Sequence, residues 1–189
     1  SAVPVGNRFF RKEFNVPEDR QIESASCAVS ADNWFKLYVN GRPVRDGSNF
    51  KEALIVDVKD SLAAGKNVLA IDAANQGDAA NPAGVLVVLN VRYVDGTSTV
   101  IVSDSSWRTA QSASTDWMTP DLNAGSWEHA RIAAAYGAGP WGEISLESGQ
   151  LFLPPVQLLR KRFVLDKSIE RATVYASALG DYQLYLNGE

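Results

Sequence analysis

Two neighbouring residues at the start of a β-like segment carry groups that bind sugars or metal ions. Asp32 and Asn33 follow Ser-Ala and precede the alternating segment that begins at Trp34. A carboxylate and an amide side by side can bond to sugar hydroxyls or supply oxygens to a hard cation such as Ca²⁺. The same two residues can instead form an Asx-type turn that leads into the strand. The pair is therefore a candidate sugar and calcium site, with the turn as the structural alternative.

A long polar loop is expected at residues 75–84, between two apolar segments. Loops at the end of a rigid β-scaffold often carry binding groups, although this composition also suits an ordinary Asn-, Gly- and Pro-rich connection. A sugar site further needs an aromatic ring against the C–H face of the sugar, which Trp34 or Phe50 could supply. The predicted sugar-binding residues are Asp32, Asn33, Trp34, Phe50, Asn81 and Pro82.

Catalysis is not expected from this chain. Inverting glycoside hydrolysis needs two carboxyl groups about 6.5–9.5 Å apart across the scissile bond. The pairs Glu143–Glu147 and Asp116–Asp121 lie in loop-like sequence, where solvated carboxylates are the simpler interpretation. His129 has no partnered nucleophile, which favours a packing or surface role.

Composition and charge exclude several classes of partner. With 189 residues, 46% of them hydrophobic and 21% charged, the chain can bury a core. A formal net charge of −4 and scattered basic residues argue against nucleic-acid binding. No apolar run reaches the ~18 residues that span a bilayer, so no membrane partner is expected. Cys27 is the single cysteine, and its strand-like surroundings predict a half-buried packing role.

The residue pattern is that of β-sheet nearly everywhere. Residues 36–39 alternate polar with apolar and run into Asn40-Gly41, the signal of a type I′ hairpin. Asp95-Gly96 predicts another hairpin, and the continuous apolar run at 85–89 predicts a strand buried on both faces. Many short strands separated by turn residues indicate an all-β fold, an antiparallel jelly-roll sandwich. Further strands are expected at residues 53–58, 67–73 and 85–91, and late strands and long loops at 103–147.

An internal repeat divides the chain. Residues 30–41 recur at residues 177–188 without a gap, and both copies end in Leu-Tyr, one variable residue and Asn-Gly. Upstream, Phe-Arg-Lys-Glu-Phe at 10–14 corresponds to Leu-Arg-Lys-Arg-Phe at 159–163. We therefore expect one sandwich over residues 1–147, followed at 148–189 by the first strands of a second, truncated sandwich.

Several motifs carry a family resemblance. They are the segments 10–14 and 30–41, Gly-Lys-Asn-Val-Leu-Ala-Ile at 65–71, Ser-Asp-Ser-Ser-Trp-Arg at 103–108 and Pro-Trp-Gly at 140–142. Together they resemble the galactose-binding-like sandwiches appended to bacterial glycoside hydrolases. The stretches 154–163 and 171–180 are similar to the start of the β-sandwich that precedes the catalytic barrel in bacterial α-L-rhamnosidases of glycoside hydrolase family 78.

The resemblance implies a function. Such enzymes can carry a rhamnose-binding module of carbohydrate-binding family 67, so residues 1–147 are expected to bind terminal rhamnose or a related sugar, with Ca²⁺ at Asp32 and Asn33. Phe50 stands where related modules often have tryptophan. The expected partners are a rhamnose-containing glycan and the missing C-terminal domains of the same polypeptide. Two alternatives stay open: a purely structural spacer that packs on the catalytic barrel, and an accessory sandwich of another glycoside hydrolase family.

Overall fold

The computed structural model describes residues 2–147, 160–164, 166–167, 170–174 and 183–187. The chain divides into two compact units, Ser1–Phe152 and Leu153–Glu189. All the strands that the structure describes lie in the first unit. The predicted boundary at 147/148 adjoins residues outside the described part, and so do most residues of the predicted second sandwich. Both statements therefore stay predictions.

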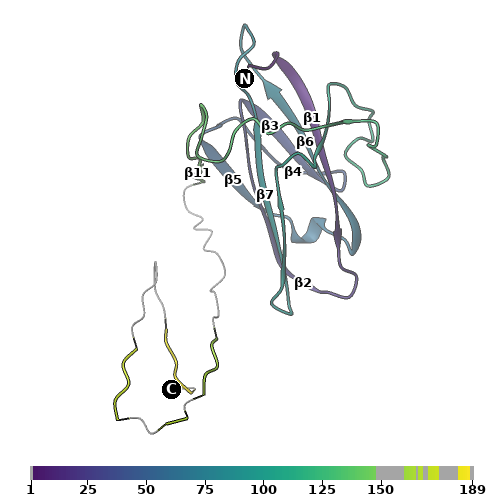
Figure 1. Ribbon diagram of the computed structural model, residues 1–189. Helices are drawn as coiled ribbons and strands as arrows, with labels where there is room; N and C mark the ends of the chain where they lie inside the picture. Colours follow the sequence, from purple (N-terminus) through teal and green to yellow (C-terminus); the bar gives the residue numbers. More distant parts are fainter. Residues whose placement is uncertain (1, 148–159, 165, 168–169, 175–182, 188–189) are drawn as a thin grey trace. The chain divides into compact units, whose positions relative to one another are not determined.

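The first unit is a β-sandwich of two sheets, which confirms the predicted all-β fold (Figure 1). One sheet has six strands in the order β10-β9-β1-β6-β3-β4, and the other has five in the order β11-β5-β2-β7-β8. Among these strands, β11 pairs parallel with β5 and the other pairings are antiparallel. In the described part of the chain, no helix has the length and hydropathy of a membrane span. The strands are β1 Gly6–Val16, β2 Ile22–Ala31, β3 Trp34–Val39, β4 Arg42–Gly47, β5 Glu52–Asp57, β6 Gly65–Asn75, β7 Val85–Tyr93, β8 Ser98–Val102, β9 Arg108–Ala110, β10 Glu128–His129 and β11 Ser145–Leu146.

The predicted Asn-Gly hairpin joins β3 to β4. Asn40 and Gly41 both have positive φ, 49° and 84°, as a type I′ turn requires. Asn187, at the equivalent position of the repeat, has a φ of 54°. The two copies of the repeat thus share the left-handed backbone conformation at this asparagine.

The main core fills the space between the two sheets. Phe35, Leu37 and Val39 alternate into it from β3, which leaves Trp34 on the outer face of the six-stranded sheet. Cys27 is fully buried in this core rather than half-buried, and burial raises the pKa of its thiol to about 12. The packing role predicted for this cysteine is therefore confirmed.

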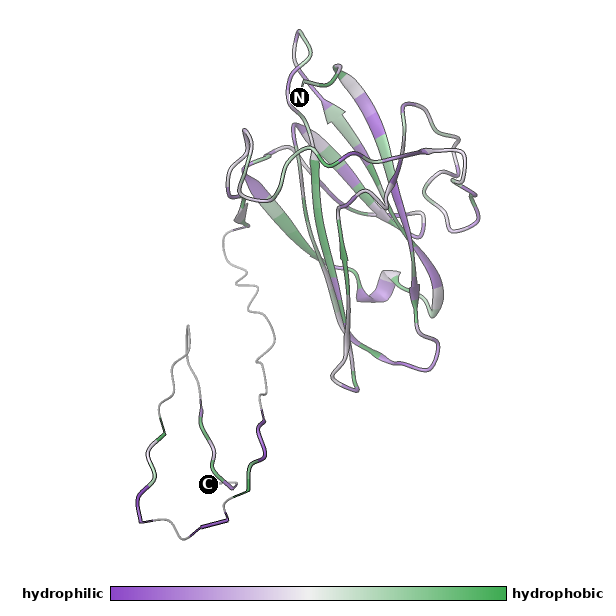
Figure 2. Ribbon diagram, in the orientation of Figure 1, coloured by the Kyte–Doolittle hydropathy of each residue, from purple (hydrophilic) through white to green (hydrophobic). Residues whose placement is uncertain are grey.

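The prediction that residues 85–89 are buried on both faces is wrong. Val87 and Leu89 point into the core, but Val88 between them is 38% exposed. On the neighbouring edge strand, Val100 and Val102 are also exposed. Figure 2 shows hydrophobic colour along β7. One face of this strand is buried in the core, and the other carries an apolar residue that the described part of the chain leaves exposed.

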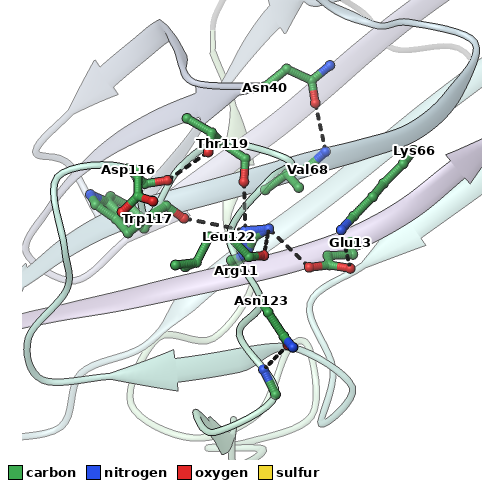
Figure 3. Close-up of polar contacts among 11 residues, drawn as sticks. Arg11, Glu13, Asn40, Lys66, Val68, Asp116, Trp117, Thr119, Leu122 and Asn123 are labelled. Atoms are coloured by element: carbon green, nitrogen blue, oxygen red, sulfur yellow. Dashed lines mark hydrogen bonds and ion pairs between the residues drawn. The ribbon is translucent and has the colours of Figure 1, made fainter.

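A second, smaller core lies on the outer face of the six-stranded sheet. Trp117, from the connection between β9 and β10, packs edge-on against Phe9 and Tyr38 and stacks with Trp127. Arg11 of β1 is buried beneath the same connection, with 1% of its surface exposed. Its guanidinium donates to the carbonyl oxygens of Thr119 at 3.0 Å and Leu122 at 2.8 Å (Figure 3).

A buried asparagine holds the turn before β6. Asn67 donates to the carbonyl oxygens of Ala63 and Gly65, and its own oxygen accepts from the Ala63 backbone and from Asn40. Asn40 Oδ1 in turn accepts from the backbone N–H of Val68 at 2.8 Å (Figure 3). The side chain of the hairpin asparagine therefore also ties the β3–β4 turn to β6.

Candidate sugar-binding site

The turn between β2 and β3 places Asp32 and Asn33 at one end of the sandwich. The Asp32 N–H donates to Gly84 O at 3.0 Å, and the Asn33 N–H donates to Ala74 O at 2.9 Å. The peptide bond between Asp32 and Asn33 is cis. The two backbone hydrogen bonds tie the turn to the residue before β7 and to the end of β6, so both side chains stand at a fixed point of the scaffold.

A hollow of about 1200 Å³ opens at this end of the sandwich. The end of β2, the start of β7 and the N-terminal part of β1 contribute to its walls, together with the segment after β10. Buried Trp107 lines it, while Asp32, Phe50 and Trp141 are half-buried along it. The hollow combines apolar and aromatic surface with a carboxylate, which is the usual character of a small-ligand site.

Asp32 is held by an aromatic residue far along the chain. Trp141 Nε1 donates to Asp32 Oδ2 at 2.9 Å. Among the described residues, the second carboxylate oxygen of Asp32 has no hydrogen-bond partner. Asp32 can therefore accept further hydrogen bonds from a ligand in the hollow.

Two of the predicted site residues hold the loop at 75–84. Asn33 Oδ1 accepts from the Gln76 backbone at 2.6 Å, and Asn81 Nδ2 donates to the carbonyl oxygens of Gln76 and Ala79 at 3.1 Å each. Asn81 also exchanges two backbone hydrogen bonds with Val3. Neither asparagine lines the hollow. The side chains of Asn33 and Asn81 thus stabilise the loop, as the alternative of an ordinary turn and connection predicts.

The remaining predicted residues fall into two groups. Phe50 lines the hollow, with the Lys51 ammonium 5.9 Å from its ring centre. Trp34 faces away from the main core on the six-stranded sheet, and Pro82 is exposed on the loop. The structure therefore brings Asp32 and Phe50 together at one hollow and leaves Trp34 and Pro82 outside its lining.

Trp141 was not among the predicted site residues, and the structure places it in the lining of the hollow. Its tripeptide, Pro-Trp-Gly, supported the family resemblance, but nothing in the sequence marked its proximity to Asp32. His129 also lines the hollow, and its Nδ1 lies 2.9 Å from Ser105 O. It is exposed, in agreement with the predicted surface role.

The residues at this turn fit a calcium ion poorly. In the described part of the chain, no group of three or more His, Cys, Asp or Glu could hold a metal ion. Asn33 Oδ1 and Asp32 Oδ2 each already accept a hydrogen bond, whereas Ca²⁺ takes six to eight oxygen ligands. Calcium therefore stays a prediction that a binding measurement must test.

Comparison with known proteins places the chain among glycosidase and lectin sandwiches. The sequence is 34% identical over 196 residues to an α-L-rhamnosidase of Streptomyces avermitilis, and the match takes in 100% of this chain and 18% of that protein. The crystal structure of that enzyme with L-rhamnose superposes with a TM-score of 0.70, over 77% of this chain and 14% of the other. No protein-family model matches the sequence.

Two further structures share the sandwich. A lectin from Pleurotus ostreatus, solved in complex with GalNAc, is 30% identical with a TM-score of 0.70, over 77% of this chain and 43% of the lectin. A glycoside hydrolase family 78 rhamnosidase of Bacillus sp. GL1 has a TM-score of 0.61 at 21% identity, over 77% of this chain and 18% of that one, and shows the shared fold.

The fold and its hollow thus define a lectin-like β-sandwich module. More particularly, the chain is homologous to a segment of an α-L-rhamnosidase, and the resemblance of its sequence to α-L-rhamnosidases is confirmed. The chain spans about 18% of the length of the curated relative that it matches.

Proposed function

We propose that the sandwich is a non-catalytic carbohydrate-binding module that takes a terminal sugar, L-rhamnose or a related one, in the hollow beside Asp32. The observation that carries this proposal is the half-buried carboxylate of Asp32, set among aromatic side chains at the end of the sandwich. A carboxylate accepts hydrogen bonds from sugar hydroxyls, and an aromatic ring packs against the C–H face of a sugar. The homologous rhamnosidase in complex with L-rhamnose and the related lectin in complex with GalNAc support the ligand class.

The whole protein would be a glycoside hydrolase that removes terminal α-L-rhamnose. The homology to an α-L-rhamnosidase supports this activity, and parts of the polypeptide outside this segment would perform it. The module would then hold the enzyme on a rhamnose-containing glycan. The competing function is a purely structural spacer, which would bind no sugar.

Titration calorimetry of the 189-residue chain with L-rhamnose, in CaCl₂ and in EDTA, separates these alternatives. A carbohydrate-binding module gives saturable heat, and parallel titration with GalNAc compares two sugars. Heat that disappears in EDTA would support calcium at Asp32 and Asn33, while heat that survives would remove the metal and keep the sugar. The absence of heat with both sugars would leave the spacer as the function of this sandwich.

Replacing Asp32 with alanine should weaken L-rhamnose binding about tenfold or more. Hydrogen bonds to a charged group contribute about 1.5–3 kcal/mol, and about 1.4 kcal/mol is a factor of ten in affinity. The matched control is Asp46→Ala, which removes the same charge from an exposed position on β4 that does not line the hollow. Equal affinities for Asp32→Ala and Asp46→Ala would refute the proposed site.

A further inference from the structure

The segment between β10 and β11, residues 130–144, crosses the open end of the sandwich. We call this segment the strap. At its start, β10 pairs with β9 at the edge of the six-stranded sheet. At its end, β11 pairs with β5 at the edge of the five-stranded sheet. The strap therefore connects the outer edges of the two sheets, and Figure 1 shows it in green on the way to β11.

The strap is closed by its own hydrogen bonds and glycines. Tyr136 donates from its hydroxyl to Ile144 O at 3.1 Å, which joins the two sides of the turn. Gly137, Gly139 and Gly142 all have positive φ, between 62° and 79°, a conformation that glycine adopts without steric cost. These turns set the place of Trp141 on the strap.

The ring of Trp141 lies beside Gly84, the residue before β7, with room for a methyl group between them. A methyl group at Gly84 would lie 3.6 Å from its six-membered ring, and one at Gly139 would lie 3.7 Å from another part of the same ring. The indole N–H donates to Asp32 Oδ2, a contact between residues 109 positions apart. The side chain is only partly buried and lines the hollow. The hydrogen bond thus holds the indole N–H at Asp32, while part of the ring surface is open to the hollow.

From this arrangement we infer that Trp141 is a positioning residue of the sugar site and one of its aromatic walls. The inference rests on the proposed function. The neutral indole N–H occupies one oxygen of the Asp32 carboxylate and fixes its orientation, so the other oxygen is presented to a sugar hydroxyl. The indole ring supplies the apolar surface that sequence reasoning sought in Trp34 or Phe50. Of those two, Phe50 lines the same hollow and Trp34 does not.

The test compares two substitutions that separate the ring from its N–H. Trp141→Phe keeps an aromatic ring and removes the hydrogen bond to Asp32, whereas Trp141→Ala removes both. We expect L-rhamnose affinity, measured by calorimetry on the 189-residue chain, to fall about fivefold to tenfold in Trp141→Phe and further in Trp141→Ala. Trp127→Phe is the matched control, because Trp127 packs in the second core and does not line the hollow.

Two readouts distinguish positioning from a general structural role. If the indole N–H acts through Asp32, its loss in Trp141→Phe and the loss of the carboxylate in Asp32→Ala will not add, and the double variant will bind about as weakly as Asp32→Ala alone. The change in tryptophan fluorescence on adding L-rhamnose will also persist in Trp127→Phe and become much smaller in Trp141→Phe, where buried Trp107 is the tryptophan left in the lining of the hollow. A purely structural tryptophan would instead give additive losses and an unchanged fluorescence response.

Each outcome decides a different statement. No heat from the unaltered chain overturns the proposed sugar site and, with it, the role of Trp141. Binding by the unaltered chain together with affinity within twofold in Trp141→Phe overturns only the role of Trp141. If Trp141→Ala fails to fold, Trp141→Phe still decides the question, because a phenyl ring fits within the space that the indole fills.

Discussion

Replacing Arg11 with methionine should lower the free energy of unfolding by about 3 kcal/mol, although methionine fills a similar apolar space. The Arg11 guanidinium donates to the carbonyl oxygens of Thr119 and Leu122, which are far away along the chain. In the variant, these carbonyls lose a charged donor, and an orphaned buried acceptor costs about 1–3 kcal/mol. Urea unfolding followed by fluorescence is a suitable measurement, because Trp117 and Trp127 lie in the same cluster.

The charge of Arg11 can be separated from its carbonyl contacts. Burial lowers the pKa of Arg11, and Glu13, whose carboxylate lies 3.0 Å from the guanidinium, raises it. Glu13 is 43% exposed and also pairs with Lys66 at 3.2 Å, so Glu13→Gln should cost less than about 1 kcal/mol. The free energy of unfolding of Arg11→Lys should remain well below that of the unaltered chain, since an ammonium cannot span the carbonyls that a guanidinium reaches. Similar losses in Arg11→Met and Glu13→Gln would contradict a carbonyl-holding role.

Substitutions at Asn67 should lower the free energy of unfolding about as much as Arg11→Met does. One of them should also make stability depend on pH. Asn67 is 0% exposed. Its side-chain N–H groups donate to the carbonyl oxygens of Ala63 and Gly65, and its side-chain oxygen accepts from the Ala63 N–H and the Asn40 amide. Asn67→Ala leaves these groups without partners, and we expect a loss of about 3 kcal/mol. Thermal unfolding of the 189-residue chain measures it.

Asn67→Asp keeps the shape but replaces the N–H₂ group with an oxygen. This oxygen would face the carbonyl oxygens of Ala63, 2.7 Å from the present Nδ2, and Gly65, 2.9 Å away. Repulsion and burial raise the pKa of the introduced carboxyl above its unfolded value of about 3.9. The folded state then binds more protons than the unfolded state, so stability falls as pH rises above about 4 and returns as pH falls. Asn15→Asp, at an exposed position on β1, is the control, and a matching pH profile in the two variants would contradict the prediction.

The fold was largely predictable because its signals are local. Asn40-Gly41 specifies its hairpin through two positive φ values, and alternation along β3 identifies which residues face the core once the sheet is known. The run at 85–89 misled because Val88 is apolar on a face that the described residues leave open. Composition reports hydrophobicity, but it does not report whether another element covers a strand.

The second core was beyond sequence reasoning for a different physical reason. In the segment 10–14, Arg11 looks like a solvent-facing strand residue, since charged side chains are seldom fully buried. It is buried because a connection more than 100 residues later lies over β1 and presents carbonyl oxygens to it. No local pattern announces such a contact.

The candidate site was predictable only in part. Asp32 and Phe50 both line the hollow, whereas Asn33 and Asn81 bond to loop backbone, and sugar binding by any of them stays a prediction. The place of Trp141 at the hollow was not predicted, because its partner Asp32 is 109 positions away. Residue type alone could not distinguish it from Trp117, which packs in the second core with 5% of its surface exposed.

The parallel pairing of β11 with β5 gives the sandwich a mechanical property. Ser145 N–H donates to Lys51 O at 3.1 Å and Glu147 N–H donates to Ala53 O at 2.9 Å, while Glu147 also pairs with Arg45 at 2.7 Å. These contacts form an anchor immediately after the strap. Tension applied to the chain beyond Glu147 would act on this anchor first. It would reach the strap, with Trp141 bonded to Asp32, only after the anchor separates from β5. We therefore expect the hollow to keep its shape under tension as long as these contacts hold.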